Sequence, residues 1–412
     1  MKYGLIGASL PHSFSKIIHE AIGKYEYELT ELAPGELASF MKKRDFLGIN
    51  VTIPYKQDVM PFLDSISPEA ARIGAVNTIV NIDGELLGFN TDFNGLAELL
   101  DKNGVDVSGK NVLIIGTGGT SKTAVYTVKF LGAASVTVAG RHPSAGQISV
   151  SEVAEKCPDA EIMINTTPCG MYPNVFEAPV DPAFFSKLEA VVDVIYNPLR
   201  TELSMKAQAL GIKAVCGLYM LVSQAVTSYE IFTGETAEDG LTDRIYSNLL
   251  SAKENIVLTG MPGSGKSTVG RILARQTGRK IFDTDELIKE KAGCEIAEIF
   301  RGSGEAGFRR IESEVIRSLA PLSGVIISTG GGCVTVPGNI SALKMNGRLC
   351  FLDRPVGLIV PTEDRPLAPD RDALTALYKK RLPLYKSCAD LIIDNSSSAD
   401  DAAAAILKGL KL

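Results

Sequence analysis

Short apolar runs alternate along the chain with longer amphipathic stretches of helical length. Apolar runs of this length, bounded by glycine and polar residues, are typical of strands. Strand–helix alternation in turn indicates parallel sheets assembled from βαβ units, so we predict an α/β protein. The predicted strands are 4–7, 48–52, 111–115, 135–138, 162–164, 191–194, 256–259, 325–328 and 348–352.

Two of these strands lead directly into glycine-rich turns, at residues 116 and 260, that open helices. Because a single doubly wound sheet rarely needs two phosphate-binding turns, we expect two separate units. The boundary is predicted near residues 247–254, which do not form a Gly/Ser-rich or Pro-rich linker. The first unit should cover residues 1–246 and the second residues 255–412.

The second turn carries a phosphate-binding pattern. Residues 260–267 are GMPGSGKS and fit G-x-x-x-x-G-K-[ST]. Backbone N–H groups of such a turn hold phosphates at a helix N-terminus, while Lys266 reaches the outer phosphates and Ser267 holds Mg²⁺. The turn therefore predicts ATP with Mg²⁺. The predicted ATP-binding residues are Gly263, Ser264, Gly265, Lys266, Ser267 and Thr268, and the predicted metal ligands are Ser267 and Asp283.

Two carboxylates, Asp283 and Asp285, follow at the end of a further strand predicted at 281–285. On a strand, residues i and i+2 share a face, so both side chains could point at the phosphate site. One such acid typically supports Mg²⁺, and another can accept a proton from a substrate hydroxyl. Asp285 has an alternative role as the N-cap of the next helix.

The first glycine turn, at residues 116–121, suits a dinucleotide, although a loose G-x-G pattern also occurs in ordinary tight turns. The next strand identifies the cofactor, because it leads to Arg141 and carries no acid for the ribose hydroxyls of NAD. An arginine there suits the 2′-phosphate of NADP(H); its alternative role is a solvated surface charge. The predicted NADP-binding residues are Gly116, Thr117, Gly118, Gly119, Thr120, Lys122, Arg141 and Gly217.

The second unit resembles shikimate kinases over residues 255–395, through segments 298–312, 328–332, 364–367 and 381–385 in family order. The resemblance implies that Arg309 and Arg381 hold the substrate carboxylate, which suits the bidentate guanidinium fork. It also implies that Asp285 takes ring hydroxyls, that Arg365 on a lid steadies the transferred phosphoryl group, and that Asp283 supports Mg²⁺ through water. The implied catalytic residues are Lys266, Asp285 and Arg365, and the implied shikimate-binding residues are Asp285, Arg309, Gly330, Gly331, Gly332, Arg365 and Arg381.

The first unit resembles shikimate dehydrogenases over residues 1–235, through segments 11–15, 50–56, 74–78, 90–92, 165–171, 193–198 and 217–224. The resemblance implies a substrate lobe formed by 1–100 with 218–246, and a Rossmann NADP lobe formed by 101–217. It also implies that Ser13 and Ser15 bind the substrate carboxylate. The residues implied to bind ring hydroxyls are Thr52, Asn77, Tyr196 and Gln224, although Tyr196 has an alternative role in packing.

Lys56 and Asp92 are implied as the catalytic pair, and chemistry supports the choice. Hydride transfer to a ketone leaves a developing alkoxide that needs a proton, which a lysine oriented by an aspartate can donate.

The sequence departs from the pattern of these families at two places in the first unit and at one place in the second unit. Lys16 replaces the usual proline, the stretch 141–162 is short, and the kinase lid at 360–365 is short and lacks a further arginine for stacking on adenine.

Composition and charge limit the partners. Charged residues make up 22% of the chain and the net charge is −6, which gives no reason to expect nucleic acid. No apolar run approaches the roughly 18 residues of a membrane span, and residues 1–7 make a poor signal peptide. The seven cysteines are scattered, which favours reduced thiols in the cytoplasm. The oligomeric state is not predicted.

Together the two resemblances imply consecutive reactions of aromatic (chorismate) biosynthesis. 3-Dehydroshikimate and NADPH would give shikimate, and shikimate and Mg-ATP would give shikimate 3-phosphate. One alternative is a quinate/shikimate dehydrogenase beside a kinase for another polyol acid. Another is a regulatory nucleotide-binding protein with inactive sites, against which the presence of Lys56, Asp92, Lys266, Asp285, Arg309 and Arg381 speaks.

Overall fold

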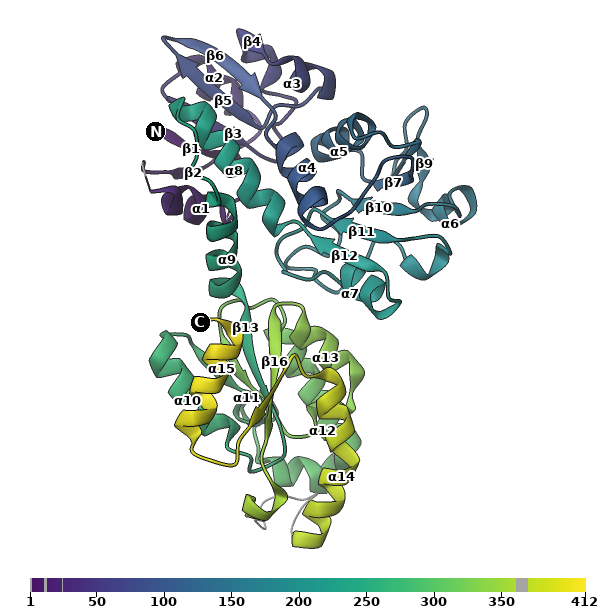
Figure 1. Cartoon of the computed structure of the whole chain (residues 1–412), viewed down its shortest axis with the longest axis vertical. Coiled ribbons are helices and arrows are strands. Elements are labelled where there is room, and N and C mark those ends of the chain that lie inside the picture. Colours follow the sequence, from purple (N-terminus) through teal and green to yellow (C-terminus); the bar gives the residue numbers. More distant parts are fainter. Residues whose placement is uncertain (1, 11–12, 24, 361–369) are drawn as a thin grey trace. The chain divides into compact units, whose positions relative to one another are not determined.

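A computed structural model describes residues 2–10, 13–23, 25–360 and 370–412. The chain divides into two compact units, residues 1–249 (unit 1) and 250–412 (unit 2) (Figure 1). The division falls within a helix, α9 (Leu241–Lys253), so the predicted boundary stretch is helical over most of its length.

The first sheet of unit 1 has the strand order β2-β1-β3-β5-β6-β4. It is mixed: β3 pairs antiparallel with β5, and β5 antiparallel with β6, which corrects the expectation of parallel sheets only. The β5–β6 pair is joined by a tight hairpin turn at Asp83 and Gly84, whose φ angles are 52° and 91°. The strands are β1 (Tyr3–Gly7), β2 (Glu28–Glu31), β3 (Gly48–Val51), β4 (Ser65–Ile66), β5 (Thr78–Ile82) and β6 (Glu85–Phe89).

The second sheet of unit 1 is entirely parallel, in the order β12-β11-β10-β7-β8-β9. In its central strand, Val112 and Ile114 pack into one core cluster while Leu113 and Ile115 pack into another. Burial on both faces explains the continuous apolar run in the sequence. The strands are β7 (Asn111–Ile115), β8 (Ser135–Gly140), β9 (Ile148–Ser149), β10 (Ile162–Asn165), β11 (Ala190–Asp193) and β12 (Lys213–Cys216).

Two helices, α4 (Asp92–Lys102) and α8 (Leu218–Thr233), lie side by side between the two sheets (Figure 1). They approach so closely that a Cβ at Gly95 would lie 2.7 Å from the Met220 carbonyl oxygen. The two sheets are therefore joined through a close helix pair. The remaining helices of unit 1 are α1 (Ser15–Ile22), α2 (Leu37–Lys43), α3 (Pro68–Ile73), α5 (Gly119–Phe130), α6 (Val153–Lys156) and α7 (Glu202–Ala209).

Unit 2 contains a parallel sheet in the order β14-β15-β13-β16-β17. The central strand, β13, leads into the phosphate-binding turn. Helix α10 begins at Lys266 directly after Gly265, whose φ of 88° is a conformation that glycine adopts without strain. The strands are β13 (Asn255–Thr259), β14 (Ile281–Asp283), β15 (Ile326–Ser328), β16 (Gly347–Asp353) and β17 (Leu391–Asp394).

The helices of unit 2 cover this sheet (Figure 1), and the longest of them, α12, is interrupted at Gly304, which has φ 67° and ψ −173°. The prediction that Asp285 lies on a strand is wrong. Strand β14 ends at Asp283, whose side chain caps α11, so the chain turns into the helix before Asp285. The helices are α10 (Lys266–Thr277), α11 (Thr284–Ala292), α12 (Ile296–Leu319), α13 (Pro337–Lys344), α14 (Arg371–Cys388) and α15 (Ala399–Leu410).

All nine strands of the first prediction are present, and each observed strand lies within two residues of its predicted bounds. None of the helices in the described part of the chain has the length and apolar character needed to cross a membrane.

Candidate functional sites

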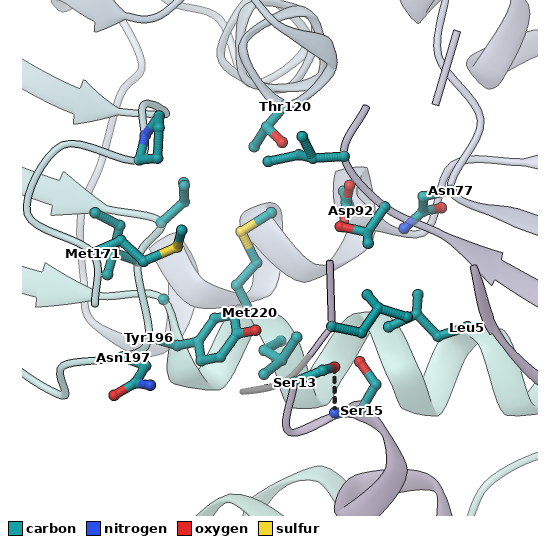
Figure 2. Close-up of a pocket in the computed structure, with 18 of the residues that line it drawn as sticks. Leu5, Ser13, Ser15, Asn77, Asp92, Thr120, Met171, Tyr196, Asn197 and Met220 are labelled. Atoms are coloured by element: carbon teal, nitrogen blue, oxygen red, sulfur yellow. Dashed lines mark hydrogen bonds between the residues drawn. The ribbon is translucent and has the colours of Figure 1, made fainter. Parts of the chain in front are cut away.

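Unit 1 contains a cavity of about 710 Å³ between its two sheets. Figure 2 shows Asp92 and Asn77 on one side of it and Tyr196 and Met171 on the other. All eight residues predicted to bind the dehydrogenase substrate line this cavity, namely Ser13, Ser15, Thr52, Lys56, Asn77, Asp92, Tyr196 and Gln224. Two predicted cofactor residues, Thr120 and Gly217, line it as well.

One wall of the cavity carries hydroxyl groups. Ser15 begins α1, and its backbone N–H donates to Ser13 Oγ at 3.2 Å (dashed in Figure 2). Tyr196 lies on the loop after β11, and its ring centroid is 5.2 Å from that of Phe14. Burial raises the pKa of Tyr196 to about 12, so its phenol stays protonated and can donate. Tyr196 therefore both packs and lines the cavity.

The charged group of this cavity is an ion pair. Lys56 Nζ lies 2.5 Å from Asp92 Oδ2, and the two side chains are 12% and 10% exposed. Lys56 follows β3, and Asp92 is the first residue of α4, so separate elements bring them together. A nearly buried ammonium next to a carboxylate is well placed to hand a proton to a ligand in the cavity.

Sequence reasoning assigned no role to Asn50, although this residue lines the same cavity. Its amide nitrogen donates to Thr78 Oγ1 at 3.0 Å and to Ser228 Oγ at 2.8 Å, and all three residues are buried. The available signal was a polar residue inside an otherwise apolar strand.

The first glycine turn joins β7 to α5. A Cβ at Gly116 would lie 2.3 Å from Thr166 Oγ1, so this position accepts only glycine. Gly118 is the N-cap of α5 and Gly119 its first residue, which points the helix N-terminus at the turn. Such an N-terminus favours the pyrophosphate of a dinucleotide.

The other cofactor residues surround this turn. Thr117 contacts the end of β8, where a Cβ at Gly140 would lie 2.5 Å from Thr117 Cγ2, and the exposed Arg141 follows immediately. Lys122, one turn into α5, donates to Gln57 Oε1 at 2.6 Å. The turn and Arg141 therefore lie at the carboxyl ends of two neighbouring strands, as an NADP site requires. Gly217 precedes α8, where a Cβ would lie 2.0 Å from the Val194 carbonyl oxygen.

In unit 2, the phosphate-binding turn is closed by its own lysine. Lys266 Nζ donates to the carbonyl oxygens of Gly260 at 3.0 Å and Met261 at 2.9 Å. The neighbouring Ser267 donates its hydroxyl to Asp283 Oδ2 at 2.6 Å. A hydroxyl and a carboxylate oxygen this close form a hard-oxygen pair of the kind that Mg²⁺ prefers, so the two predicted ligands fit the ion.

The remaining turn residues differ in exposure. Gly263, Gly265 and Thr268 are exposed, whereas Ser264 is fully buried and its hydroxyl has no hydrogen-bond partner among the described residues.

Asp283 and Asp285 have different environments. Asp283 Oδ1 accepts the backbone N–H of Asp285 at 3.0 Å, so Asp283 rather than Asp285 caps the helix. Burial raises the pKa of the Asp285 carboxyl, even though Lys266 opposes the shift. A Cβ at Gly330 would lie 2.8 Å from Asp285 Oδ1, which brings the predicted glycine segment against this acid.

The two predicted carboxylate-binding arginines lie close to the glycine segment. Arg381 is 3% exposed and donates to the Gly331 carbonyl oxygen at 3.1 Å. A Cβ at Gly332 would lie 2.0 Å from Arg309 Nη2. The structure therefore brings Asp285, both arginines and the glycine segment together. Arg365, like motif residues 11 and 12 of unit 1, lies outside the described residues.

A further acid, Glu312, was not assigned a role from the sequence. Its Oε2 lies 2.7 Å from Arg309 Nη1, it is fully buried, and its Oε1 has no hydrogen-bond partner in the described part of the chain. Burial raises its pKa, because the nearby arginine compensates only part of the desolvation. The available signal was its spacing, since residues three apart on a helix face each other.

The described residues contain no group of three or more His, Cys, Asp or Glu side chains placed to hold a metal ion.

Comparisons with known proteins agree with this geometry. Residues 5–79 match the family described as "Shikimate dehydrogenase substrate binding domain", and residues 262–411 match "Shikimate kinase". The chain is 33% identical over 288 residues to shikimate dehydrogenase (NADP(+)) of Moorella thermoacetica, covering 64% of this chain and 96% of the relative.

Solved structures give the same result. Shikimate dehydrogenase 1 from Peptoclostridium difficile is 36% identical with a TM-score of 0.57, over 60% of this chain and 98% of that chain. Shikimate 5-dehydrogenase from Thermus thermophilus, solved with NADP(H) and shikimate, is 29% identical with a TM-score of 0.54, over 60% and 99%.

Proposed function

The chain belongs to the shikimate dehydrogenase family and carries a shikimate kinase domain, and from this premise we propose which residues perform the two reactions. The protein is a bifunctional enzyme that reduces 3-dehydroshikimate with NADPH and phosphorylates shikimate with Mg-ATP. The observation that supports the residue assignment best is a single cavity lined by all eight predicted dehydrogenase residues. We assign the dehydrogenase to residues 1–246 and the kinase to residues 255–412.

Within the dehydrogenase, the proposed substrate lobe is 1–100 with 218–246 and the proposed NADP lobe is 101–217. Bound NADPH supplies the hydride. Lys56 then donates its proton to the oxygen that becomes a hydroxyl, and Asp92, 2.5 Å away, keeps the ammonium oriented. Because the pair is nearly buried, water competes little for that proton.

Substrate recognition in this cavity uses neutral hydrogen-bond donors. Ser13 and Ser15 face the carboxylate from the start of α1, where the positive end of the helix dipole also favours an anion. The protonated Tyr196 hydroxyl, with Thr52, Asn77 and Gln224, contacts the ring hydroxyls.

In the kinase, Asp285 is the proposed proton acceptor for the attacking hydroxyl. Its raised pKa brings it closer to neutral pH, which makes a carboxylate a better base. Lys266, Ser267 and Asp283 would hold Mg-ATP, which supplies the phosphoryl group. The residues of the turn position that group, since phosphoryl transfer depends mainly on positioning and charge.

The shikimate carboxylate is assigned to Arg309 and Arg381. Glu312 Oε2 lies 2.7 Å from Arg309 Nη1 and so already restricts the Arg309 side chain before substrate binds. The loss of side-chain entropy on binding is therefore smaller. Arg365 stays a prediction for the lid.

We also propose that the protein works in the cytoplasm. All seven cysteines are free thiols, which is the usual state in a reducing compartment.

The test is mass spectrometry after incubating the protein with 3-dehydroshikimate, NADPH, ATP and Mg²⁺. Shikimate 3-phosphate is the expected product. Shikimate alone would contradict the kinase assignment. Absence of any product would contradict the dehydrogenase assignment, and the kinase would then be assayed on shikimate.

A further inference from the structure

A buried group of hydroxyl and amide side chains lies behind the dehydrogenase cavity, and its centre is Ser228 of α8, which is 0% exposed. Ser228 Oγ donates to the Gln224 carbonyl oxygen at 2.8 Å. It also lies 2.8 Å from Asn50 Nδ2, 2.9 Å from Thr78 Oγ1 and 3.1 Å from Thr91 Oγ1. A serine within a helix satisfies its hydroxyl hydrogen with the carbonyl four residues earlier, so three further polar atoms within 3.1 Å of its oxygen call for another explanation.

Tyr27 determines which atoms of this group donate hydrogen bonds and which accept them. Its hydroxyl donates to Asn50 Oδ1 at 2.7 Å, and burial raises the pKa of Tyr27 well above its usual value, so the proton stays. With Oδ1 of Asn50 used as an acceptor, Nδ2 donates to Ser228 and, at 3.0 Å, to Thr78. Ser228 therefore accepts from Asn50 and donates to its own helix, while the Thr78 and Thr91 hydroxyls beside it donate to the side chains of Asn77 and Gln224.

This direction extends to the two amides that face the cavity. Asn77 Oδ1 accepts the backbone N–H of Thr91 at 2.7 Å and the Thr78 hydroxyl at 3.1 Å, while its Nδ2 donates to Thr91 Oγ1 at 3.0 Å. Gln224 Nε2 donates to the Leu221 carbonyl oxygen at 2.8 Å, and Oε1 accepts the Thr91 hydroxyl at 3.4 Å. Each amide nitrogen carries two hydrogens, so one on each remains for the cavity.

We propose that Ser228 is a positioning residue of the dehydrogenase, whose hydroxyl anchors the group that turns the N–H donors of Asn77 and Gln224 towards the substrate. This inference rests on the proposed assignment of those two amides to substrate binding. The inference adds that the ring oxygens of the substrate that contact Asn77 and Gln224 accept hydrogen bonds from them. A site built to donate to an oxygen rejects analogues that lack it, because its donors are then left unpaired.

Steady-state kinetics of Ser228→Ala tests the proposal. Without the anchor the two amides lose their fixed orientation, so KM for 3-dehydroshikimate should rise about tenfold while kcat and KM for NADPH stay within about twofold. Ser223→Ala is the matched control: Ser223 is on the same helix and 1% exposed, but its hydroxyl donates to Glu98 Oε2 at 2.7 Å. An equal KM rise in both variants would overturn the proposal.

Shikimate analogues that each lack one non-reacting ring hydroxyl give a readout that a purely structural role would not change. For one of them, Ser228→Ala and wild-type protein should show the same KM, because the oxygen that the amides hold is missing. If Ser228→Ala raises KM for every analogue alike, Ser228 serves the fold and the proposal is rejected. Should Ser228→Ala fail to fold, Ser228→Cys carries the test together with Ser223→Cys, since a thiol is larger than a hydroxyl and bonds weakly: a KM raised in Ser228→Cys alone supports the proposal, and an unchanged KM or an equal rise in both overturns it.

Asn77→Ala, measured in parallel, separates this inference from the proposed function. An unchanged KM in both Asn77→Ala and Gln224→Ala would reject the assignment of the cavity amides, and with it the inference. A raised KM in Asn77→Ala together with an unchanged KM in Ser228→Ala would reject only the positioning role.

Discussion

Lys56 and Lys266 illustrate how differently the two units treat a single buried charge. Lys56 is neutralised by Asp92 at 2.5 Å, whereas Lys266 donates to two backbone carbonyls within its own turn. A lysine that donates a proton needs a carboxylate that supports its positive charge before the proton is transferred. A lysine that binds phosphate needs hydrogen-bond partners that it can leave when the phosphate arrives. Each environment suits the role proposed for that lysine.

Lys56→Ala should reduce dehydrogenase turnover by roughly 10²–10⁴-fold, the usual contribution of a positioned acid, and leave phosphorylation of shikimate unchanged. Lys266→Ala should show the reverse. Separate assays of the two reactions on each variant provide the measurement. Lys110→Ala serves as the control, because Lys110 pairs with Glu161 and Glu189 away from both sites. Loss of both activities in either variant would contradict two independent sites.

Asp193 gives unit 1 a defined pH dependence. It is fully buried at the end of β11, where it accepts from Asn165, Ile195 and Thr201, and burial raises its pKa from 3.8 to about 6. The folded state therefore binds this proton more tightly than the unfolded state. The stabilisation is fully present below pH ~4 and is lost as pH rises through ~6, a change of about 3 kcal/mol in the free energy of unfolding.

Asp193→Asn should remove this dependence. Between pH 4 and pH 7 the free energy of unfolding of wild-type protein should fall by about 3 kcal/mol relative to that of the variant. Hydrogen exchange of residues 190–197 at a series of pH values, corrected for the intrinsic exchange rate, measures it. A difference between the two proteins that stays constant with pH would rule out Asp193 as the titrating group.

At the scale of the elements, the glycine segment that follows β15 leaves little room for a side chain. Gly331 and Gly332 are neighbours in sequence but face different partners. A Cβ at Gly331 would lie 2.8 Å from the Pro262 backbone nitrogen in the phosphate-binding turn, whereas one at Gly332 would lie 2.0 Å from Arg309 Nη2. Backbone cannot move aside easily, but the end of an arginine side chain can.

Alanine at these two positions should therefore have separate effects. Gly331→Ala should raise KM for ATP more than KM for shikimate, and Gly332→Ala should do the opposite, each by about tenfold or more. Measuring both KM values for both variants checks this. Gly338→Ala is a control with open space around its Cβ. The same pattern of KM changes in the two variants would contradict the assignment of the partners.

The elements that sequence reasoning predicted are those with local signals. Strands buried on both faces, such as β7 and β13, give uninterrupted apolar runs, and glycine turns follow them directly. The β5–β6 hairpin was missed although Asp83 and Gly84 are a typical two-residue turn. Asp285 was placed on a strand because nothing in its own residue type showed that Asp283 would cap a helix first.

The candidate sites were predictable to the extent that their residues stand in recognisable segments. The group around Ser228 was not, because it joins residues as far apart as Asn50 and Ser228, which are 178 positions apart. The pairing of Glu312 with Arg309 depends on which helix face is buried, and the sequence pattern alone left that undecided.

On the scale of the whole molecule, one chain catalyses two consecutive reactions, with the sites described above in separate units. The product of the first reaction is a small soluble acid. Unless it is held, it leaves one site and reaches the other by diffusion.

A mixture of Lys56→Ala and Lys266→Ala proteins should therefore convert 3-dehydroshikimate into shikimate 3-phosphate, with a lag that shortens as protein concentration rises. Time courses by mass spectrometry provide the measurement, and each variant alone is the control. A mixture that accumulates no shikimate 3-phosphate would show that released shikimate is not the intermediate.

The buried Arg381, assigned above to the shikimate carboxylate, has a practical consequence for inhibitor design. If Arg309 and Arg381 read the substrate carboxylate, that site depends on a full negative charge, whereas Lys56 is the one cation among the described residues that line the dehydrogenase cavity, and it is already paired with Asp92. A guanidinium discriminates charge more strongly than a serine hydroxyl does. Shikimate carboxamide should therefore keep much of its affinity for the first site and lose most of it for the second, which makes selective inhibition of one half of a fused enzyme a tractable aim.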